Sequence, residues 1–600
     1  MSDLPESGRS QSQSRTRTRP VLWAVLVLVL LVVAAVLWVG VRGAMAARDL
    51  KQSVALVSTV RTQITHGDTA AATSTVRQLR DRATSAEHLT SDPVWRMVEF
   101  VPLAGPNLRA VRQVAAVVAD VSDNAVQPAV GVLDDVDVSQ FRPTGGKIDL
   151  QPLVRAQKPV DRATRTLDRA LQDASDIDTS GTVGAVNDAV GQLVATLTTT
   201  SRQAVVADKA VDLAPAMLGA DGPKNYLLLF QNNAELRAGG GIPGAVAYVH
   251  AEDGSLQLQQ QSSGAGIGMF DPSVLPLSTD TRGLYGDITG QYMQDVTLTP
   301  RFDLSAKLAR EMWKRKYGQE VDGVLTLDPV TLGYILKATG PVTLPTGDTL
   351  TADNAASLLL SEAYAKYPDP TVQDAFFASA AGAVFTKVAS GDFDPKAFIG
   401  ALTTGVDERR VLLWSADPAE QRTISGTAIA GELPTSTDAE SRFGVYLNDA
   451  TGAKMDYYLT EQIAVGSQVC RADGRPTWTV DVTLQNTAPA DAGTSLPEYV
   501  TGGGAFGVPP GQVQTNLLVY APTSGVFLSA TRDGQPAAPQ TATDGKYPVV
   551  QLQTRLSPGE STTVRIQYLG PVRAAKSTVS VESTPGVHAN VTKPLALSCE

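Results

Sequence analysis

An unbroken apolar run near the start of the chain predicts a membrane-spanning helix. Residues 21–41, VLWAVLVLVLLVVAAVLWVGV, contain no charged side chain. At about 1.5 Å per residue, a helix of this length crosses the hydrocarbon core of a bilayer. Trp23 and Trp38 lie near the two ends of the run, where indole rings favour the membrane interface. We therefore expect the lipid bilayer to be a partner of residues 21–41.

Basic residues before this run predict its orientation. Arg9, Arg15, Arg17 and Arg19 precede the apolar segment, so the positive-inside rule places the N-terminus in the cytoplasm. We expect residues 1–20 to form a disordered cytoplasmic tail and the chain after about residue 45 to lie outside a single-pass cell membrane. The alternative is a cleaved signal peptide, but the apolar run is longer than the usual 7–15 residues of such a segment.

The next 170 or so residues show helical periodicity. Apolar residues recur every three or four positions, as at Val160, Ala163, Leu167 and Ala170. The turn signals that interrupt this pattern are His66–Asp68, Ser91–Pro93, Pro102–Pro106 and Pro143–Gly146. Residues 45–215 are therefore predicted to form an all-α stalk or bundle of about four long helices.

From about residue 222 the pattern changes to strands alternating with helices. The expected strands are Tyr226–Phe230, Ala245–His250, Leu256–Gln261 and Gly323–Leu327, and the expected helices are Ser305–Tyr317, Pro329–Ala338, Ala352–Tyr364 and Gln373–Ala389. Such alternation predicts an α/β domain over residues 222–424. Asp353 is expected to cap the third helix.

After about residue 425 the helical pattern ends. Short alternating runs such as Trp478–Leu484, Gln514–Tyr520 and Thr562–Tyr568 are separated by turns rich in Gly, Pro and Asp. This pattern predicts a β-sandwich over residues 425–600. The fold class is therefore multidomain: a transmembrane helix, an α-helical stalk, an α/β domain and a C-terminal β-sandwich.

Charge and cysteine content narrow the range of partners. The 600 residues carry a net charge of −11, of which the first twenty contribute +2 and the remainder −13. An acidic folded part argues against nucleic acid as a partner. The only two cysteines, Cys470 and Cys599, would form one disulfide outside the membrane, or else remain two separate buried thiols.

Familiar catalytic motifs are missing from the sequence. The four histidines, His66, His88, His250 and His588, are scattered over three regions, so no catalytic triad or zinc site can be assembled from them. The glycine-rich stretch Gly264–Gly268 does not open a convincing helix, so it does not predict a nucleotide site.

The strongest candidate site is the segment NYLLLFQNNAELRAGGGIPG at residues 225–244. We expect its apolar strand to end near Phe230 and to be followed by polar side chains and a glycine-rich turn, an arrangement that α/β proteins use for binding sites. Arg237 could bind a phosphate or carboxylate, and Glu235 could orient it, bind a cation or act as a base. The alternative is a buried ion pair with amides that cap sheet edges.

Other residues could complete this site. The candidate ligand-binding residues are Gln231, Asn232, Asn233, Gly239, Gly240 and Lys454. Asp303 could serve with Glu235 as a base or as a ligand for Mg²⁺. Polar residues of this kind, however, also cap turns and helices.

Several phrases resemble the domain-of-unknown-function 4012 family of bacterial envelope proteins. They are NYLLLFQNNAELRAGGGIPG, VDGVLTLDPVTLGYILKATGPVTLP at 321–345, LTADNAASLLLSEAYAKYPD at 350–369, PLAGPNLRA at 102–110, VLLWSADPAEQ at 411–421 and VYLNDATGAKMDYYL at 445–459. The resemblance covers roughly residues 90–460. It implies an extracytoplasmic protein of the cell envelope or cell wall.

Residues 321–345 are also similar to the core of LytR-CpsA-Psr phosphotransferases. Those enzymes move glycopolymers from a lipid pyrophosphate to peptidoglycan with arginines, aspartates and a divalent cation. The similarity implies that Arg237 stands in the place of their first arginine. Gln-Asn-Asn-Ala-Glu-Leu-Arg replaces their first arginine motif, however, and Tyr364-Ala365-Lys366 replaces their later arginine pair.

Three functional hypotheses follow, of which the third, an adhesin or surface-structure component, rests on the predicted stalk and sandwich alone. The first is an envelope protein of glycopolymer biogenesis or attachment that transfers a phosphoglycosyl group. In it Arg237 holds the pyrophosphate of a lipid-linked precursor, Glu235 or Asp303 binds Mg²⁺ or acts as base, and the amides position sugar. The second is a non-catalytic glycan-binding or scaffolding protein of the envelope.

Overall fold

The computed structural model describes residues 18–66, 68–135, 141–572 and 577–599. The predicted tail, apart from residues 18–20, lies outside the described residues. By internal contacts the chain divides into two compact units. The first contains residues up to 137 and 152–211, and the second contains residues 138–151 and 212–600.

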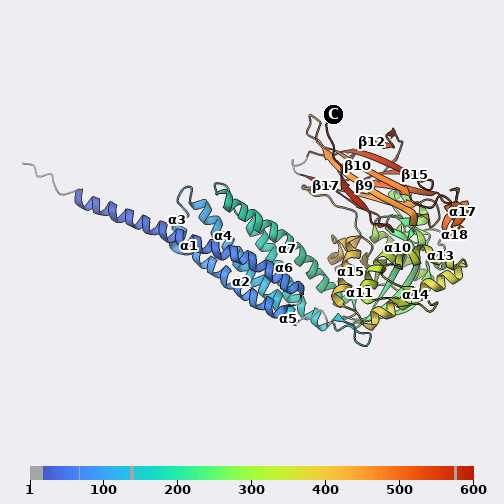
Figure 1. Cartoon of the computed structure of the whole chain (residues 1–600), viewed down its shortest axis with the longest axis horizontal. Helices are drawn as coiled ribbons and strands as arrows, with labels where there is room; N and C mark the ends of the chain where they lie inside the picture. Colours follow the sequence, from blue (N-terminus) through green and yellow to red (C-terminus); the bar gives the residue numbers. More distant parts are fainter. Residues whose placement is uncertain (1–17, 67, 136–140, 573–576, 600) are drawn as a thin grey trace, which may run out of the picture. The chain divides into compact units, whose positions relative to one another are not determined.

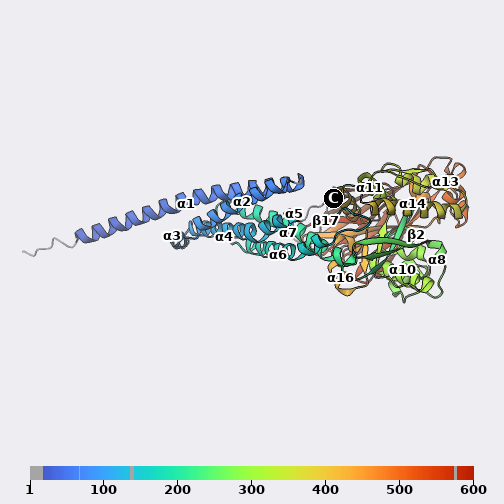
Figure 2. The ribbon, with the colours of Figure 1, turned by 90° about the horizontal axis from the view of Figure 1, so that it is seen from below.

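The first unit is helical, as its periodicity predicts. Its elements are α1 (Thr18–His66), α2 (Thr69–Thr90), α3 (Pro93–Val98), α4 (Gly105–Val121), the π-helical turn η1 (Ser122–Val126), α5 (Gln127–Asp135), α6 (Gln151–Ser175) and α7 (Gly184–Met217), the last of which continues into the second unit. Most helix breaks in this unit lie at predicted turns, and Asp68 and Asp92 cap α2 and α3 with their side chains. The break between α6 and α7 was not predicted. Figures 1 and 2 show α1 lying alongside α2.

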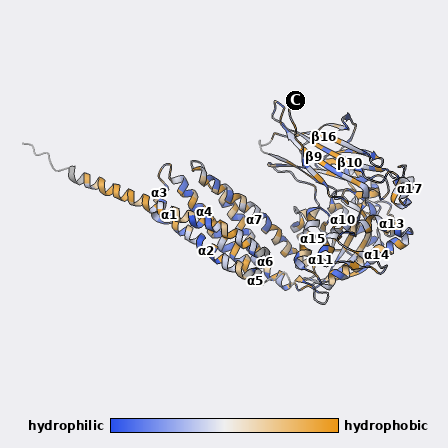
Figure 3. Cartoon of the chain, in the orientation of Figure 1, coloured by the Kyte–Doolittle hydropathy of each residue, from blue (hydrophilic) through white to orange (hydrophobic). Residues whose placement is uncertain are grey.

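Helix α1 is longer than the apolar run that begins it. Residues 22–60 are long and apolar enough to cross a membrane, and the apolar part is coloured accordingly in Figure 3. Side chains from Leu22 to Val33 are exposed, whereas Ala46, Asp49, Ser53 and Val60 are buried against neighbouring helices. Helix α1 therefore has two parts: an exposed apolar segment at its start and an amphipathic segment that packs in the bundle.

The second unit begins with a mixed sheet in the order β3-β2-β1-β4-β7. Its strands are β1 (Lys224–Arg237), β2 (Gly240–Glu252), β3 (Ser255–Ser263), β4 (Gly323–Leu327) and β7 (Leu413–Ser415). Strands β1 and β4 are parallel, and the other neighbours are antiparallel. The buried residues Met312 and Trp313 of helix α10 (Phe302–Tyr317) share a core cluster with β1, β2 and β4.

Further helices and short strands accompany this sheet. They are α8 (Gly264–Ile267), α9 (Thr279–Tyr285), η3 (Asp287–Gly290), η4 (Met293–Leu298), α11 (Pro329–Thr339), β5 (Val342–Thr343), β6 (Thr349–Leu350), α12 (Ala355–Ser357), the π-helical η5 (Leu358–Glu362), α13 (Ala363–Lys366), α14 (Pro370–Ser390), α15 (Pro395–Asp407), α16 (Pro418–Ile424) and η6 (Ala428–Ala430). The prediction that Asp353 caps a helix is wrong. Asn354 precedes α12, and its side chain accepts a hydrogen bond from the Thr351 N–H instead.

Two more sheets follow in the C-terminal part. One has the order β13-β12-β16-β10-β9-β18 and the other β14-β15-β11-β8-β17. The elements are β8 (Glu440–Asp449), η7 (Met455–Tyr458), β9 (Leu459–Gln468), β10 (Thr477–Asn486), α17 (Ala492–Ser495), α18 (Glu498–Thr501), η8 (Gly502–Gly504), β11 (Val513–Tyr520), β12 (Val526–Arg532), β13 (Gln535–Pro536), β14 (Gln540–Asp544), β15 (Tyr547–Leu556), β16 (Ser561–Leu569), β17 (Thr578–Ser583) and β18 (Val591–Pro594). Alternate residues of both sheets, such as Phe443, Leu517, Val480 and Ile566, belong to one buried core.

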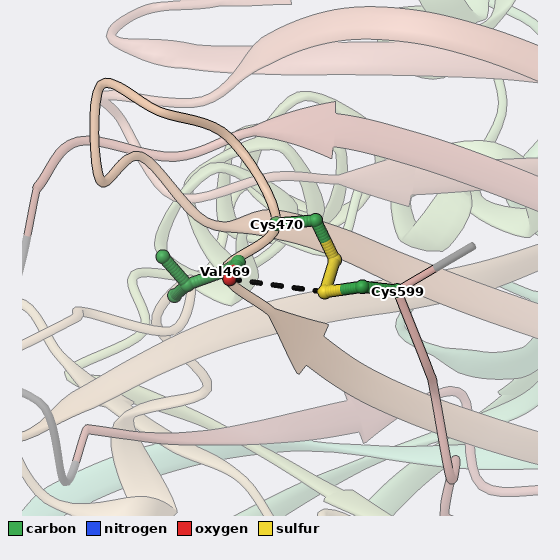
Figure 4. Close-up of a disulfide and its surroundings, with 3 residues drawn as sticks. All are labelled: Val469, Cys470 and Cys599. Atoms are coloured by element: carbon green, nitrogen blue, oxygen red, sulfur yellow. Dashed lines mark hydrogen bonds between the residues drawn. A yellow bond between two sulfur atoms is a disulfide. The ribbon is translucent and has the colours of Figure 1, made fainter.

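A disulfide closes the end of this region. It joins Cys470, which follows β9, to Cys599, which follows β18 (Figure 4). Strand β18 pairs in parallel with β9, so the bond holds the terminal segment beside the strand on which it lies. The Cys599 sulfur lies 3.9 Å from the Val469 carbonyl oxygen. This is a packing contact, because a disulfide sulfur carries no proton to donate.

The core of the C-terminal sheets contains a buried acid, Glu461 of β9. It is 8% exposed, and neither of its carboxylate oxygens has a hydrogen-bond partner within the described chain. Burial raises the pKa of Glu461 from 4.5 to about 8, although the nearby Ser583 opposes the shift. The folded protein therefore favours the protonated acid.

This acid predicts that stability falls as pH rises. Between pH 4.5 and about 8 the folded state keeps a proton on Glu461 that the unfolded chain loses. The free energy of unfolding should therefore decrease by up to ~1 kcal/mol per pH unit over this window and level off above it. Glu461→Gln should remove this part of the slope, and urea unfolding at several pH values measures it. The exposed Glu252→Gln is the control, and equal slopes for wild type and Glu461→Gln would contradict the assignment.

Candidate functional site

The polar residues of the candidate site lie within strand β1, not after it as predicted. The strand continues through Arg237, which pairs with Gly240 of β2, and its register shifts after Phe230 and after Asn232. The ladder continues because the strands approach closely there: a Cβ on Gly241 would lie 2.5 Å from the Asn232 carbonyl oxygen. Only Gly240, with a φ of 126°, takes a backbone conformation that favours glycine at this turn.

The amides of this segment bind the protein's own backbone and side chains. Gln231 donates from Nε2 to the Gly239 carbonyl oxygen at 2.9 Å. Asn233 is fully buried and donates from Nδ2 to the Pro585 carbonyl oxygen at 3.0 Å. Asn232 donates to the Tyr364 hydroxyl and accepts from the Ala234 N–H at 3.0 Å. The predicted sugar-binding amides thus stabilise the turn and its contacts with later segments.

Glu235, Arg237 and Lys454 form the centre of a buried ionic cluster. Arg237 donates from Nη2 to the Glu235 carboxylate at 3.1 Å, and Lys454 donates from Nζ to the other oxygen of that carboxylate. Each of the three residues is 8% exposed. The structure therefore brings together three residues that the sequence singled out, two of which are 219 positions apart.

Two aspartates that flank the cluster extend it. Arg237 also donates from Nη2 to Asp295 at 3.2 Å and from Nη1 to the Leu236 carbonyl oxygen at 3.1 Å. Asp456 accepts from the Leu236 N–H at 2.7 Å, which ties β1 to the segment before β9. The ring of Tyr499 lies 5.6 Å from Lys454 Nζ, at a distance where cation–π attraction operates.

The electrostatics of the cluster favour its ion pairs. Burial alone would raise the pKa of Glu235, but Lys454 and Arg237 lower it below its ordinary value. Burial opposes the charge on Arg237, yet Glu235, Asp295 and Asp449 raise its pKa. Both the acid and the cations are therefore held in their charged forms by one another.

Two further buried carboxyls have raised pKa values. Burial and the charge of Glu235 raise the pKa of Asp449 to about 6. Burial and the neighbouring Asp449 raise the pKa of Asp456 well above its ordinary value. The pKa of Glu235 is thus lowered, whereas the pKa values of Asp449 and Asp456 in the same cluster are raised.

The carboxylates of this cluster do not fit the Mg²⁺ that the phosphotransferase similarity implies. Both oxygens of Glu235 already face cations. The two oxygens of Asp449 accept backbone N–H groups of Thr451 and Gly452 at 2.9 and 2.7 Å. Among the described residues, no group of three or more His, Cys, Asp or Glu side chains is arranged to hold a metal ion.

Asp303 takes no part in the contacts of this cluster among the described residues. It lies half-exposed in the first turn of α10, where it pairs with Lys307 at 3.0 Å. Sequence reasoning also missed three residues that do take part, Asp295, Asp449 and Tyr499. No local motif marks any of them, since each comes close to the cluster only in the folded chain.

Comparison with known proteins identifies one family. Residues 221–364 match the family model described as "Protein of unknown function (DUF4012)". The match confirms the predicted relationship to DUF4012 and contains Glu235, Arg237 and Tyr364. No curated protein and no solved structure matches the chain.

Proposed function

Since residues 221–364 belong to the DUF4012 family, whose function is unknown, we propose a function from the chain's own chemistry. The chain is a membrane-anchored, extracytoplasmic scaffolding or glycan-binding protein of the cell envelope, with a non-catalytic part in glycopolymer biogenesis or attachment. The observation that carries the proposal is the state of Arg237 and Lys454. Both cations of the candidate site are buried and paired with carboxylates of the same chain.

The site chemistry supports scaffolding over phosphoglycosyl transfer. A side chain that grips a pyrophosphate needs free donors that face the ligand. Arg237 instead directs its two terminal nitrogens to Leu236, Glu235 and Asp295, and Glu235 has no oxygen left to act as base or to bind a cation. The arrangement of the cluster is therefore that of a structural contact, which holds β1 against the segment between β8 and β9.

Two other features support the proposed location. Helix α1 begins with a segment long and apolar enough to cross a bilayer. The Cys470–Cys599 disulfide suits an oxidising compartment outside the cytoplasm. The basic residues before α1 favour a cytoplasmic N-terminus.

The proposal includes finer assignments of fold and partner. We assign residues 425–600 to a β-sandwich, which the shared core of the two C-terminal sheets supports. The relationship of residues 222–424 to the LytR-CpsA-Psr core rests on the sequence similarity. The glycopolymer, or its lipid-linked precursor, is proposed from the resemblance to envelope families.

The test removes the Arg237 guanidinium and neutralises Asp295, an aspartate with which it pairs. In the double variant Arg237→Met/Asp295→Asn, the Glu235–Lys454 pair persists and the methionine fills the space of the arginine stem. We expect wall-linked glycopolymer at the wild-type amount in this strain and a reduced amount in a deletion strain. Polymer is measured in purified walls, and the level of the variant protein in membranes is measured by immunoblot.

Each other outcome contradicts a separate part of the proposal. Polymer reduced to the deletion level, with the double variant present at wild-type level, would show that Arg237 acts on a ligand and would favour phosphoglycosyl transfer. An unchanged wall in the deletion strain would show that the glycopolymer role is wrong. The exposed pair Asp303→Ala/Lys307→Ala serves as the matched control.

A further inference from the structure

Large apolar side chains are exposed at one end of the helical unit. Met97, Phe100, Val101 and Leu103, here called the apolar tip, are 64%, 84%, 48% and 88% exposed. They occupy the end of α3 and the loop that leads to α4. A group of apolar side chains at this exposure marks an interaction surface.

Contacts within the unit place the apolar tip at the end of the apolar segment of α1. The Trp38 indole donates from Nε1 to Asp92 Oδ1 at 3.4 Å, and Arg42 Nε lies 3.0 Å from the other oxygen of Asp92. A Cβ on Gly43 would lie 3.5 Å from the Trp95 ring. Helix α3, which begins after Asp92, therefore packs where residues 21–41 end, and Figure 1 shows α3 where α1 extends beyond the bundle.

The tip is held in its exposed conformation by specific contacts. The ion pair between Arg112 and Glu99, at 2.6 Å, fixes the start of the loop. The Gly105 N–H donates to the Val101 carbonyl oxygen at 2.8 Å, and Leu103 has a φ of 70°, which is uncommon for a residue other than glycine. The backbone thus presents Phe100 and Leu103 outward instead of folding them into the bundle.

The neighbouring turn presents another apolar residue at the same end. Asn107 of α4 accepts the N–H of Val183, which precedes α7, at 2.8 Å. Val183 is 58% exposed. Two basic side chains, Arg96 and Arg109, are exposed on α3 and α4. Apolar side chains with basic residues beside them suit the interface of a bilayer that contains anionic lipids.

We propose that the apolar tip inserts into the interface of the same bilayer that α1 spans. The inference rests on the proposed anchoring by α1, and it adds a second membrane contact through residues 97–103. The occupant is lipid because α3, which carries the tip, packs against α1 at Trp38 and Gly43, where the exposed apolar segment of α1 ends. The tip and α1 together hold the helical unit against the membrane, which differs from a stalk attached by one helix alone.

Fluorescence quenching in vesicles tests this inference. The full chain, with its disulfide intact, is reconstituted into phosphatidylcholine and phosphatidylglycerol vesicles that contain lipids with a doxyl quencher. Single cysteines for an environment-sensitive dye are introduced as Leu103→Cys in the tip, Val32→Cys in the apolar segment of α1 and Val206→Cys on α7. Val206 is 61% exposed and lies 22 helical residues beyond Gly184, or about 33 Å along α7.

We expect the dye at position 103 to be quenched several-fold more than the dye at position 206, and the dye at position 32 to be quenched as well. Equal quenching at 103 and 206, with strong quenching at 32, would overturn the tip insertion and leave the anchor in place. Absence of quenching at 32 would overturn the anchoring itself. A blue-shifted but unquenched dye at 103 would show that protein covers the tip, which also contradicts insertion into lipid.

Discussion

Replacement of Glu235 by alanine is expected to lower the free energy of unfolding by about 3–5 kcal/mol. The substitution leaves Lys454 without its carboxylate partner and leaves Arg237 with only Asp295, while both cations remain buried. An uncompensated buried charge costs far more than the exposed ion pairs of this chain contribute. Urea unfolding of the detergent-solubilised full chain, followed by hydrogen exchange in β1 and β9, measures the effect.

The control for this prediction is Asp303→Ala. Asp303 and Lys307 are about half exposed, so loss of their pair should change the free energy of unfolding by less than ~1 kcal/mol. If Glu235→Ala lowered the free energy of unfolding by no more than Asp303→Ala, the cluster would not stabilise the fold, and its cations would be available for a ligand.

Replacement of Trp478 by alanine should also destabilise the C-terminal sheets by about 3–5 kcal/mol. Trp478 of β10 is 1% exposed and packs edge-on against Phe443 of β8, which belongs to the other sheet, with ring centroids 5.6 Å apart. A Cβ on Gly570 would lie 2.5 Å from the indole, so the surrounding backbone is already close to the ring. The cavity left by the alanine would remove contacts between the two sheets in their common core.

Hydrogen exchange of the β10 and β11 amides measures this change, because it reports the local stability of the two sheets directly. Phe506→Ala is the matched control because Phe506 is 71% exposed. Equal protection of these amides in Trp478→Ala and wild type would mean that the two sheets are held together by other contacts.

Local patterns in the sequence predicted a part of the helices and strands. The α10, α11 and α14 helices and the β10, β11 and β16 strands follow from apolar periodicity and from capping or turn residues, which act over a few positions. The misplaced cap at Asp353 shows the limit of such rules. Thr351 and Asn354 bond to each other instead, and adjacent polar residues compete for the same role.

The extent of β1 depended on contacts that no local pattern contains. Its polar half, Gln231–Arg237, looks like a loop in sequence because amides and charges replace the apolar run. It forms a strand because β2 lies close enough to require Gly241 and because Asp456, 220 residues later, accepts the Leu236 N–H. Tertiary contacts therefore determine the structure of residues 231–237, which belong to the strongest candidate site in the sequence.

The sequence predicted which residues form the candidate site, but it did not predict that their charges pair with one another. Glu235, Arg237 and Lys454 could each be named from residue type and position. Their mutual pairing could not, since Lys454 reaches Glu235 only when the segment after β8 packs on β1. An arginine binds either a ligand or a carboxylate of its own chain, depending on its burial and on the side chains around it. Neither property can be read from the sequence alone.

A double-mutant cycle between Glu235 and Lys454 tests the internal pairing most directly. The free energy of unfolding is measured for wild type, Glu235→Ala, Lys454→Ala and the double variant, all as full chains in detergent. We expect a coupling free energy of about 2 kcal/mol or more, because the pair is buried and Lys454 without Glu235 would be an unpaired charge, whereas Glu235 without Lys454 keeps only Arg237. A coupling below ~0.5 kcal/mol would contradict the account, since Lys454 would then be free to bind a ligand of the envelope.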